Sequence, residues 1–277
     1  MRLKPSGTRA LLNLIFAVLM TVLCLPPVAC AAEIRIGGTG NALGTMRLLG
    51  EAFTRQHPET SIVILDSIGT SGALKALPKG SIEIGLSSRQ VSEDESRSGL
   101  TTLEYARSPT VFAVNKKSKV LSITLEQIAD LYSGKLTSWP DGTKIRPVLR
   151  QPGDDNTRQV KRLSAEIEQA LAVAEKREGM NYASTDQEAA DKLESTPGSI
   201  GVTTLALIRS ENRNLRPLAI GGAEPSPENM NSGRYPMIKA FYFVLPKEPT
   251  PAVMEFVSFV RSPQGRKILE QNGHSIP

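Results

Sequence analysis

Cysteine is almost absent from this sequence. The chain of 277 residues has only Cys24 and Cys30, and both lie within its first 31 residues. The remaining chain therefore offers no disulfide, no cysteine metal site and no cysteine nucleophile. Histidine is as scarce, because His57 and His274 are the only two and neither stands in a metal-ligand spacing. The sequence predicts no metal site and no cofactor.

Excess charge and aromatic rings are also scarce. The net charge is +5, but three basic residues and no acid stand in the first 31, which leaves 30 basic and 28 acidic residues beyond them. Only 5% of the residues are aromatic. A chain with so little net positive charge and so few rings is not expected to bind nucleic acid.

Catalytic motifs are missing as well. The chain has no G-x-S-x-G segment, and a Ser-His-Asp triad would have to use one of its two histidines. The neighbouring acids Asp154 and Asp155 could form a carboxylate pair for hydrolysis, but at a helix start such acids are commonly a cap and a partner of the helix dipole. The sequence predicts a protein that is not an enzyme.

The first 31 residues have the order of a secretory signal peptide. Three basic residues precede an apolar run at 11–25, and Ala29-Cys30-Ala31 fits an A-x-A cleavage site. The run has 15 residues, whereas a membrane span needs about 20. We therefore expect residues 1–31 to be removed and the protein to reach the periplasm. The alternative is a lipid anchor on Cys30, against which Pro27 stands three residues earlier, where an aliphatic residue is usual.

The rest of the chain alternates apolar strands, small-residue loops and helices. That order is typical of an α/β fold with a largely parallel sheet. The longest helix is expected at about 158–177, and a terminal helix at 252–269 is expected to break near Pro263. Strands are expected at residues 34–36, 61–65, 81–86, 110–115, 145–150, 199–203, 215–220 and 235–245.

Four loops rich in Gly, Ser and Thr follow strands, at residues 37–44, 66–73, 85–89 and 150–158. Helices begin after three of them, and the first N–H groups of a helix can bind an oxyanion. Taken singly, a Ser or Thr there is most often only a helix cap, and an arginine is often solvated or ion-paired. The candidate ligand residues are Thr39, Gly40, Asn41, Ser67, Thr70, Ser71, Ser87, Ser88, Arg89, Arg150, Asp154, Asp155, Asn156 and Thr157.

A dinucleotide-binding fold is the competing interpretation of the first loop. Gly38, Gly40 and Gly44 follow a strand and open a helix, and Asp66 ends the next strand. The segment Gly69-Thr70-Ser71-Gly72 has no role in that scheme, and an exported protein meets few such cofactors. The loops therefore favour an anion site.

The ordered set of segments resembles the periplasmic phosphate-binding proteins of bacterial phosphate ABC transporters. The resemblance covers nearly the whole chain after the leader. Its clearest part is the segment IADLYSGKLTSW at 128–139, which is similar to the family pattern I-x-x-I-F-x-G-K-I-x-x-W. The other segments are GTG at 38–40, GTSGA at 69–73, EIGLSSR at 83–89, Arg150 before its loop, PGSIGV at 197–202 and GRYP at 233–236.

This resemblance implies the two-lobed class II periplasmic-binding-protein fold, with each lobe a mostly parallel sheet flanked by helices. It implies one lobe at residues 32–112 plus 241–277 and a second at 113–240, joined by two crossovers near 111–116 and 239–245. It further implies a monomer that captures a small oxyanion, phosphate first, between the lobes and delivers it to a membrane ABC permease.

The sequence departs from the family pattern at two places in this site. Ser88 stands where the phosphate-specific proteins have the aspartate that accepts the ligand proton. The family's Ser-Gly-Thr segment is replaced by Asp154-Asp155-Asn156 or, with a shift of one residue, by Asp155-Asn156-Thr157. Asp154 or Asp155 would then accept the proton, or both would only cap their helix. The alternative function is the same fold acting as a ligand-sensing or surface-interaction module without transport.

Overall fold

A computed structural model describes residues 32–277. The predicted signal peptide and the predicted alternative anchor at Cys30 lie outside the described residues. Within residues 32–277, no helix is long and apolar enough to cross a membrane.

The first part of the sheet is parallel, and isoleucines of its central strand lie opposite isoleucines of both neighbouring strands. Strand β1 (Ala32–Gly38) pairs with β2 (Thr60–Ile64) on one side and with β3 (Ile84–Ser87) on the other. Ile34 faces Ile62 and Ile36 faces Ile84 in the two registers. The helices after these strands are α2 (Gly40–Thr54), α3 (Gly69–Ala76), the 3-10 turn η1 (Leu77–Lys79) and α4 (Glu93–Arg97).

A second parallel group lies further along the chain. Strand β6 (Arg146–Arg150) pairs with β7 (Asn181–Ala183) and β8 (Ser199–Thr204). The remaining elements of this region are β5 (Ser122–Ile123), α5 (Leu125–Ser133), α6 (Asp155–Lys161), α7 (Ala165–Lys176), α8 (Asp186–Ser195), α9 (Leu205–Ser210), β9 (Leu215–Pro217), β10 (Ala219–Ile220) and α10 (Pro227–Asn231).

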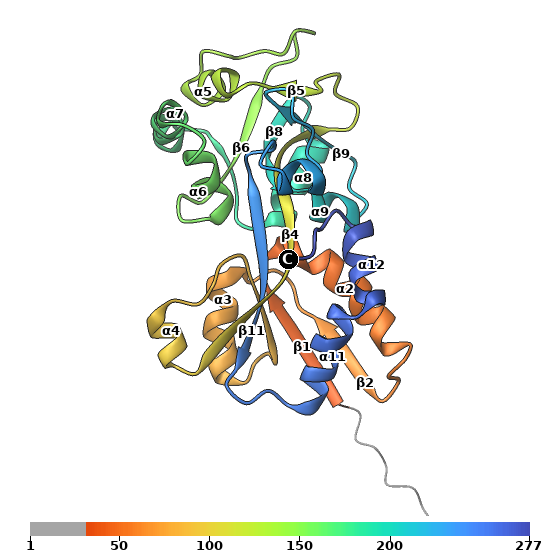
Figure 1. The fold of residues 1–277 in the computed structure, drawn as a ribbon. Helices are drawn as coiled ribbons and strands as arrows, with labels where there is room; N and C mark the ends of the chain where they lie inside the picture. The colour runs from red at the N-terminus through yellow and green to blue at the C-terminus, as the bar shows by residue number, and fades with distance from the viewer. Residues whose placement is uncertain (1–31) are drawn as a thin grey trace, which may run out of the picture. The chain divides into compact units, whose positions relative to one another are not determined.

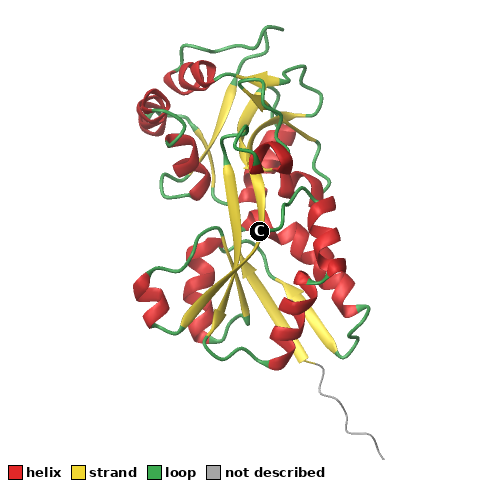
Figure 2. Ribbon diagram, viewed as in Figure 1, coloured by secondary structure: helices red, strands yellow, loops and turns green. Residues whose placement is uncertain are grey.

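Two long antiparallel strands connect these groups (Figure 1). Residues 100–109 of β4 (Leu100–Asn115) pair with β11 (Ile238–Pro246), and residues 110–114 of the same strand pair with β8. The chain closes with α11 (Pro251–Arg261) and α12 (Pro263–Gln271), divided at Ser262 as the break near Pro263 predicts. Figure 2 shows the helices flanking the strands in both groups.

The apolar cores are separate on the two sides of these crossovers. One cluster draws only on residues 111–237, and two others draw on residues 34–106 and 241–269. These separate cores support the lobes that we propose at residues 32–112 plus 241–277 and 113–240. A ligand cleft between two cores can open and close by bending the two crossover strands.

Two local predictions are wrong in detail. The helix expected at 158–177 is two helices, because the Ser164 hydroxyl accepts a hydrogen bond from Ile167 N–H and starts α7 after α6 has ended. The strand expected at 215–220 is likewise two short strands, since β9 pairs with β4 and β10 pairs with β5. The longest described helix is α2, with 15 residues.

Candidate functional site

A cavity of about 300 Å³ lies where the carboxyl ends of β1, β3 and β6 meet the starts of α2, α3, α6 and α8. Ten of the fourteen predicted ligand residues line it, and four do not. Those that line it are Thr39, Asn41, Ser67, Thr70, Ser71, Ser88, Arg89, Arg150, Asp154 and Asp155. The cavity is also lined by Ile68, Gly69, Gly153, Arg158, Ser184, Thr185, Asp186 and Lys239, which the sequence did not predict.

We call the cavity surface from the first part of the chain the hydroxyl wall. It comprises the lining residues of 39–41, 67–71 and 88–89. Helices α2 and α3 open onto it; in neither helix does the N-cap residue make a side-chain hydrogen bond, and neither has an acid in its first turn. The other nine α-helices of residues 32–277 each have a Ser, Thr or Asp side-chain cap. The two helix starts whose own N-cap residues make no side-chain hydrogen bond thus both open onto the cavity, where their N–H groups suit an oxyanion.

Hydroxyl groups fix the loops of this wall. Thr70 Oγ1 accepts a 3.1 Å hydrogen bond from Ser88 N–H and lies 3.3 Å from Ser88 Oγ. Ser87 Oγ donates to Arg89 O at 2.5 Å and accepts from Arg89 N–H at 3.1 Å. Ser87 therefore closes its own loop and does not line the cavity.

Arg89 lines the cavity with its guanidinium already paired. Its two terminal nitrogens donate to the two carboxylate oxygens of Glu95, each at 2.8 Å. These hydrogen bonds from Arg89 lower the pKa of Glu95 to about 2. The bidentate pair leaves Arg89 less free to bind a ligand than its position in the sequence indicates.

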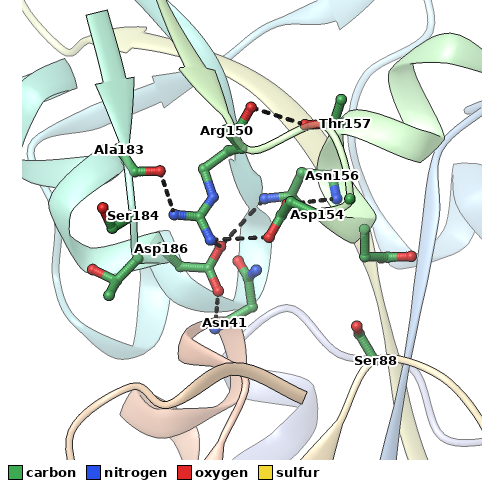
Figure 3. A network of polar contacts seen from close by, with 12 residues as sticks. Asn41, Ser88, Arg150, Asp154, Asn156, Thr157, Ala183, Ser184 and Asp186 are labelled. Atoms are coloured by element: carbon green, nitrogen blue, oxygen red, sulfur yellow. Dashed lines mark hydrogen bonds and ion pairs between the residues drawn. The ribbon is translucent and has the colours of Figure 1, made fainter. Parts of the chain in front are cut away.

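We call the opposite surface the charged wall. It comprises Arg150, Gly153–Asp155, Arg158, Ser184–Asp186 and Lys239. Arg150 ends β6, and its side chain is only 8% exposed. It donates to Ala183 O and to Asp154 Oδ2, both at 3.0 Å, and its Nη2 lies 3.4 Å from Asp186 Oδ1 (Figure 3). Within the described residues, Arg150 Nε is buried and has no partner.

The two predicted acids are both engaged by neighbours. Asp154 caps α6 through a 2.9 Å hydrogen bond from Asn156 N–H, as one of the two interpretations of the sequence expects. Asp155 Oδ2 accepts hydrogen bonds from Lys239 Nζ at 2.8 Å and from Gln159 Nε2 at 2.7 Å. Burial alone would raise the pKa of Asp155, but Lys239 and Gln159 hold it below its ordinary value. Both acids still line the cavity, so a contact of either with a ligand stays a prediction.

Three further predicted residues support the site from behind. Asn156 Nδ2 donates to Asp186 Oδ1 at 3.3 Å, and Thr157 Oγ1 donates to Arg150 O at 3.4 Å. Gly40 is the first residue of α2, and its carbonyl oxygen accepts a 2.9 Å hydrogen bond from Gln187 Nε2. These contacts position Asp186, Arg150 and α2, respectively.

Sequence reasoning missed Asp186 and Lys239. Asp186 is 4% exposed, and Lys239 is 2% exposed. Burial raises the pKa of Asp186 above its ordinary value; the charge of Arg150 opposes this shift and that of Asp154 adds to it. Each residue carried a local signal: Ser184-Thr185-Asp186 opens a helix after a strand, and Lys239 interrupts an apolar run.

Metal ligands do not gather in this cavity. Within residues 32–277, no group of three or more His, Cys, Asp or Glu side chains is placed to hold a metal ion. The cavity acids lie instead beside cations, with Arg150 at Asp154 and Asp186 and Lys239 at Asp155. The chemistry of the site is that of hydroxyl groups, helix N–H groups and paired charges.

Comparison with known proteins gives consistent matches. A family model described as a PBP superfamily domain matches residues 26–264. A phosphate-binding protein PstS from Borreliella burgdorferi is 25% identical over 249 residues, which cover 86% of this chain and 89% of that protein.

Solved structures match over most of their length. One from Clostridium perfringens, described as a candidate phosphate ABC transporter substrate-binding protein with bound phosphate, has a TM-score of 0.73 at 23% identity and covers 88% of this chain and 99% of its own. The periplasmic molybdate-binding protein of Azotobacter vinelandii has a TM-score of 0.63 at 16% identity, covering 88% and 100%. These likenesses confirm the predicted two-lobed α/β fold.

Proposed function

Because the chain belongs to the PBP superfamily, we propose that it is a solute-binding protein which captures a small oxyanion, most favourably phosphate, in the cavity between the hydroxyl wall and the charged wall. The proposal assigns it binding and no catalysis. One observation carries it: the starts of α2 and α3, whose own N-cap residues make no side-chain hydrogen bond, open onto the same cavity as Arg150.

The chemistry of the cavity suits a small oxyanion. The N–H groups at the starts of α2 and α3 supply donors without formal charge, and Thr70 and Ser71 add hydroxyl groups. Arg150 contributes a forked cation whose buried Nε is unpaired among the described residues. The relatives named for phosphate point to the same ligand class, and the molybdate-binding neighbour shows that the fold also accommodates another tetrahedral anion.

Cellular context completes the proposal. A signal peptide at residues 1–31 would place the protein in the periplasm. There it would act as a monomer and deliver its anion to a membrane ABC permease. Opening of the cleft would follow bending of β4 and β11, the strands by which the chain passes between the separate cores.

A thermal-shift screen tests this function directly. The unit of residues 32–277 is heated with phosphate, sulfate, molybdate, phosphonates and small carboxylates in turn. A ligand at 100 times its dissociation constant stabilises a protein by about 2.7 kcal/mol, so phosphate should raise the melting temperature clearly. If none of these anions changes the melting temperature, oxyanion capture is wrong and the sensing or interaction module becomes the better explanation.

A further inference from the structure

The start of α2 is bound by a carboxylate of the protein itself. Asp186 Oδ2 accepts a 3.0 Å hydrogen bond from Asn41 N–H, which is one of the first donors of that helix (Figure 3). The other carboxylate oxygen, Oδ1, accepts from Asn156 Nδ2 at 3.3 Å and lies 3.4 Å from Arg150 Nη2. A helix N–H and an arginine are the donors that an external oxyanion would use in this cavity.

This contact joins elements from opposite sides of the cleft. The apolar residues of α2 belong to the core with β1, whereas those of α8 belong to the core with β6 and β8. Asp186 is the first residue of α8, so its bond to Asn41 crosses from one core to the other. Asp154, the second acid at Arg150, makes no such crossing, because within residues 32–277 its side chain bonds only to Arg150 and Asn156.

Neighbouring contacts strengthen the crossing. Gln187 Nε2 donates to Gly40 O at 2.9 Å, and Thr204 Oγ1 donates to Asn41 Oδ1 at 3.0 Å. A Cβ atom on Gly40 would lie 2.9 Å from Asp186 Cβ and 2.4 Å from Gln187 Oε1, so only glycine allows this approach. The contact between the two cores at this point is thus built around the bond between Asp186 and α2.

We propose that Asp186 is a built-in anion that holds the cleft closed without ligand and that an incoming oxyanion must displace from Asn41 N–H. The proposal rests on oxyanion capture as the function. It makes Asp186 a specificity-determining residue, because a competing ligand must present two acceptor oxygens to replace both carboxylate contacts. An anion that can accept only weakly, such as chloride, would leave the carboxylate in place.

Removal of the charge separates this role from a supporting one. Asp186→Asn keeps the size of the side chain but releases Arg150 and Asn41 N–H from a competing anion. We expect the variant to bind inorganic phosphate about tenfold more tightly than the wild type. If Asp186 served only to orient Arg150, the variant would bind phosphate more weakly or equally, and either result would overturn the proposal.

The ligand-free cleft provides a second, independent readout. Residues 32–277 contain no cysteine, so Lys75→Cys on α3 and Glu168→Cys on α7 take two spin labels at defined exposed positions on opposite sides of the cleft. Without phosphate, pulsed electron resonance should give one short distance for the wild type and a longer or broader distribution for Asp186→Asn. An unchanged distribution in the variant contradicts the proposal.

Two matched controls locate the effect. Asp191→Asn removes an acid from the same helix, 65% exposed and bonded to Arg213 outside the cavity, and should leave both the distance and the affinity unchanged. Asp154→Asn removes a charge at Arg150 without a bond across the cleft, and should leave the ligand-free distance unchanged.

Asp186→Ala replaces the first variant if thermal melting shows that Asp186→Asn does not fold. If no protein in the series binds phosphate, oxyanion capture fails, while the label distance still decides whether Asp186 closes the cleft.

Discussion

The hydroxyl wall and the charged wall face one cavity but are built in different ways. The hydroxyl wall presents hydroxyl groups and two helix starts whose own N-cap residues make no side-chain hydrogen bond, and its one guanidinium is bonded to Glu95. The charged wall presents cations and acids in contact, with Arg150 beside Asp154 and Asp186. The contrast indicates that the first wall supplies general oxyanion affinity, whereas the charge balance of the second decides which anion enters.

Loss of Lys239 should break the charged wall most severely. Its ammonium is the cation bonded to the partly buried Asp155, and removal of one partner of a buried ion pair costs about 3–5 kcal/mol of unfolding free energy. Lys239→Met should show a loss of that size in urea denaturation. The control Arg97→Met removes a cation from exposed pairs with Glu93 and Asp94 and should change stability by less than about 1 kcal/mol. Equal losses of unfolding free energy in the two variants would contradict a special role of the buried Lys239 ion pair.

Substitution of one arginine in each wall tests how much each wall contributes to phosphate affinity. Arg150→Ala should weaken phosphate binding by about 2–3 kcal/mol, because it removes a charge-assisted donor from the cavity. Arg89→Ala should have a smaller effect, since Glu95 already holds that guanidinium. Arg146, an exposed residue on the same strand as Arg150, provides the control, and Arg146→Ala should bind as the wild type does. Calorimetric titrations that give equal or reversed effects for Arg150 and Arg89 would show that the assignment is wrong.

Low pH should destabilise the folded protein through protonation of Asp155. Its pKa is held below the ordinary value in the folded protein, so the unfolded chain takes up a proton first as the pH falls. This contribution to stability is complete above the unfolded pKa of about 3.9 and is lost as the pH drops below it, at up to about 1.4 kcal/mol per pH unit.

Asp155→Asn isolates that contribution. The variant should be less stable than the wild type at pH 6, because Lys239 loses its partner, and the difference should shrink toward pH 3. Urea denaturation at both pH values measures it. A constant difference between the two proteins would mean that Asp155 is not the titrating group.

The smallest effect is expected at the hydroxyl wall. Thr70→Val keeps the side-chain shape but removes the hydroxyl that bonds to Ser88 N–H and lines the cavity. Loss of one neutral hydrogen bond should weaken phosphate binding by about 1 kcal/mol. Thr54→Val, which removes a hydroxyl bonded to Thr60 O away from the cavity, should leave the affinity unchanged. A tenfold or larger loss in Thr70→Val would mean that the hydroxyl wall is not a set of weak, shared donors.

The hydroxyl wall could be predicted from the sequence because each of its loops is local. A strand, a small-residue loop and a helix start follow one another within a few residues, so Thr39, Thr70 and Ser88 could be assigned without knowledge of the fold. The same reasoning predicted the α/β class with a largely parallel sheet and the break near Pro263.

The charged wall could not be predicted in full because its bonds join distant segments. Lys239 and Asp155 are 84 residues apart, and Asn41 and Asp186 are 145 apart. The strand before Asp186 has only three residues, too few to show a hydrophobic period. The helix expected at 158–177 is divided because the Ser164 hydroxyl caps α7. The sequence did not predict this division, because a serine is found both at helix caps and on solvated helix faces.

A crystal structure of residues 32–277 grown with phosphate tests the central claim most directly. The account predicts one phosphate between the two walls, within hydrogen-bonding distance of Asn41 N–H and the Arg150 guanidinium, with the Asp186 carboxylate moved away from Asn41. Phosphate bound elsewhere on the protein, or a cavity in which Asp186 still accepts from Asn41 N–H at saturating phosphate, would contradict it.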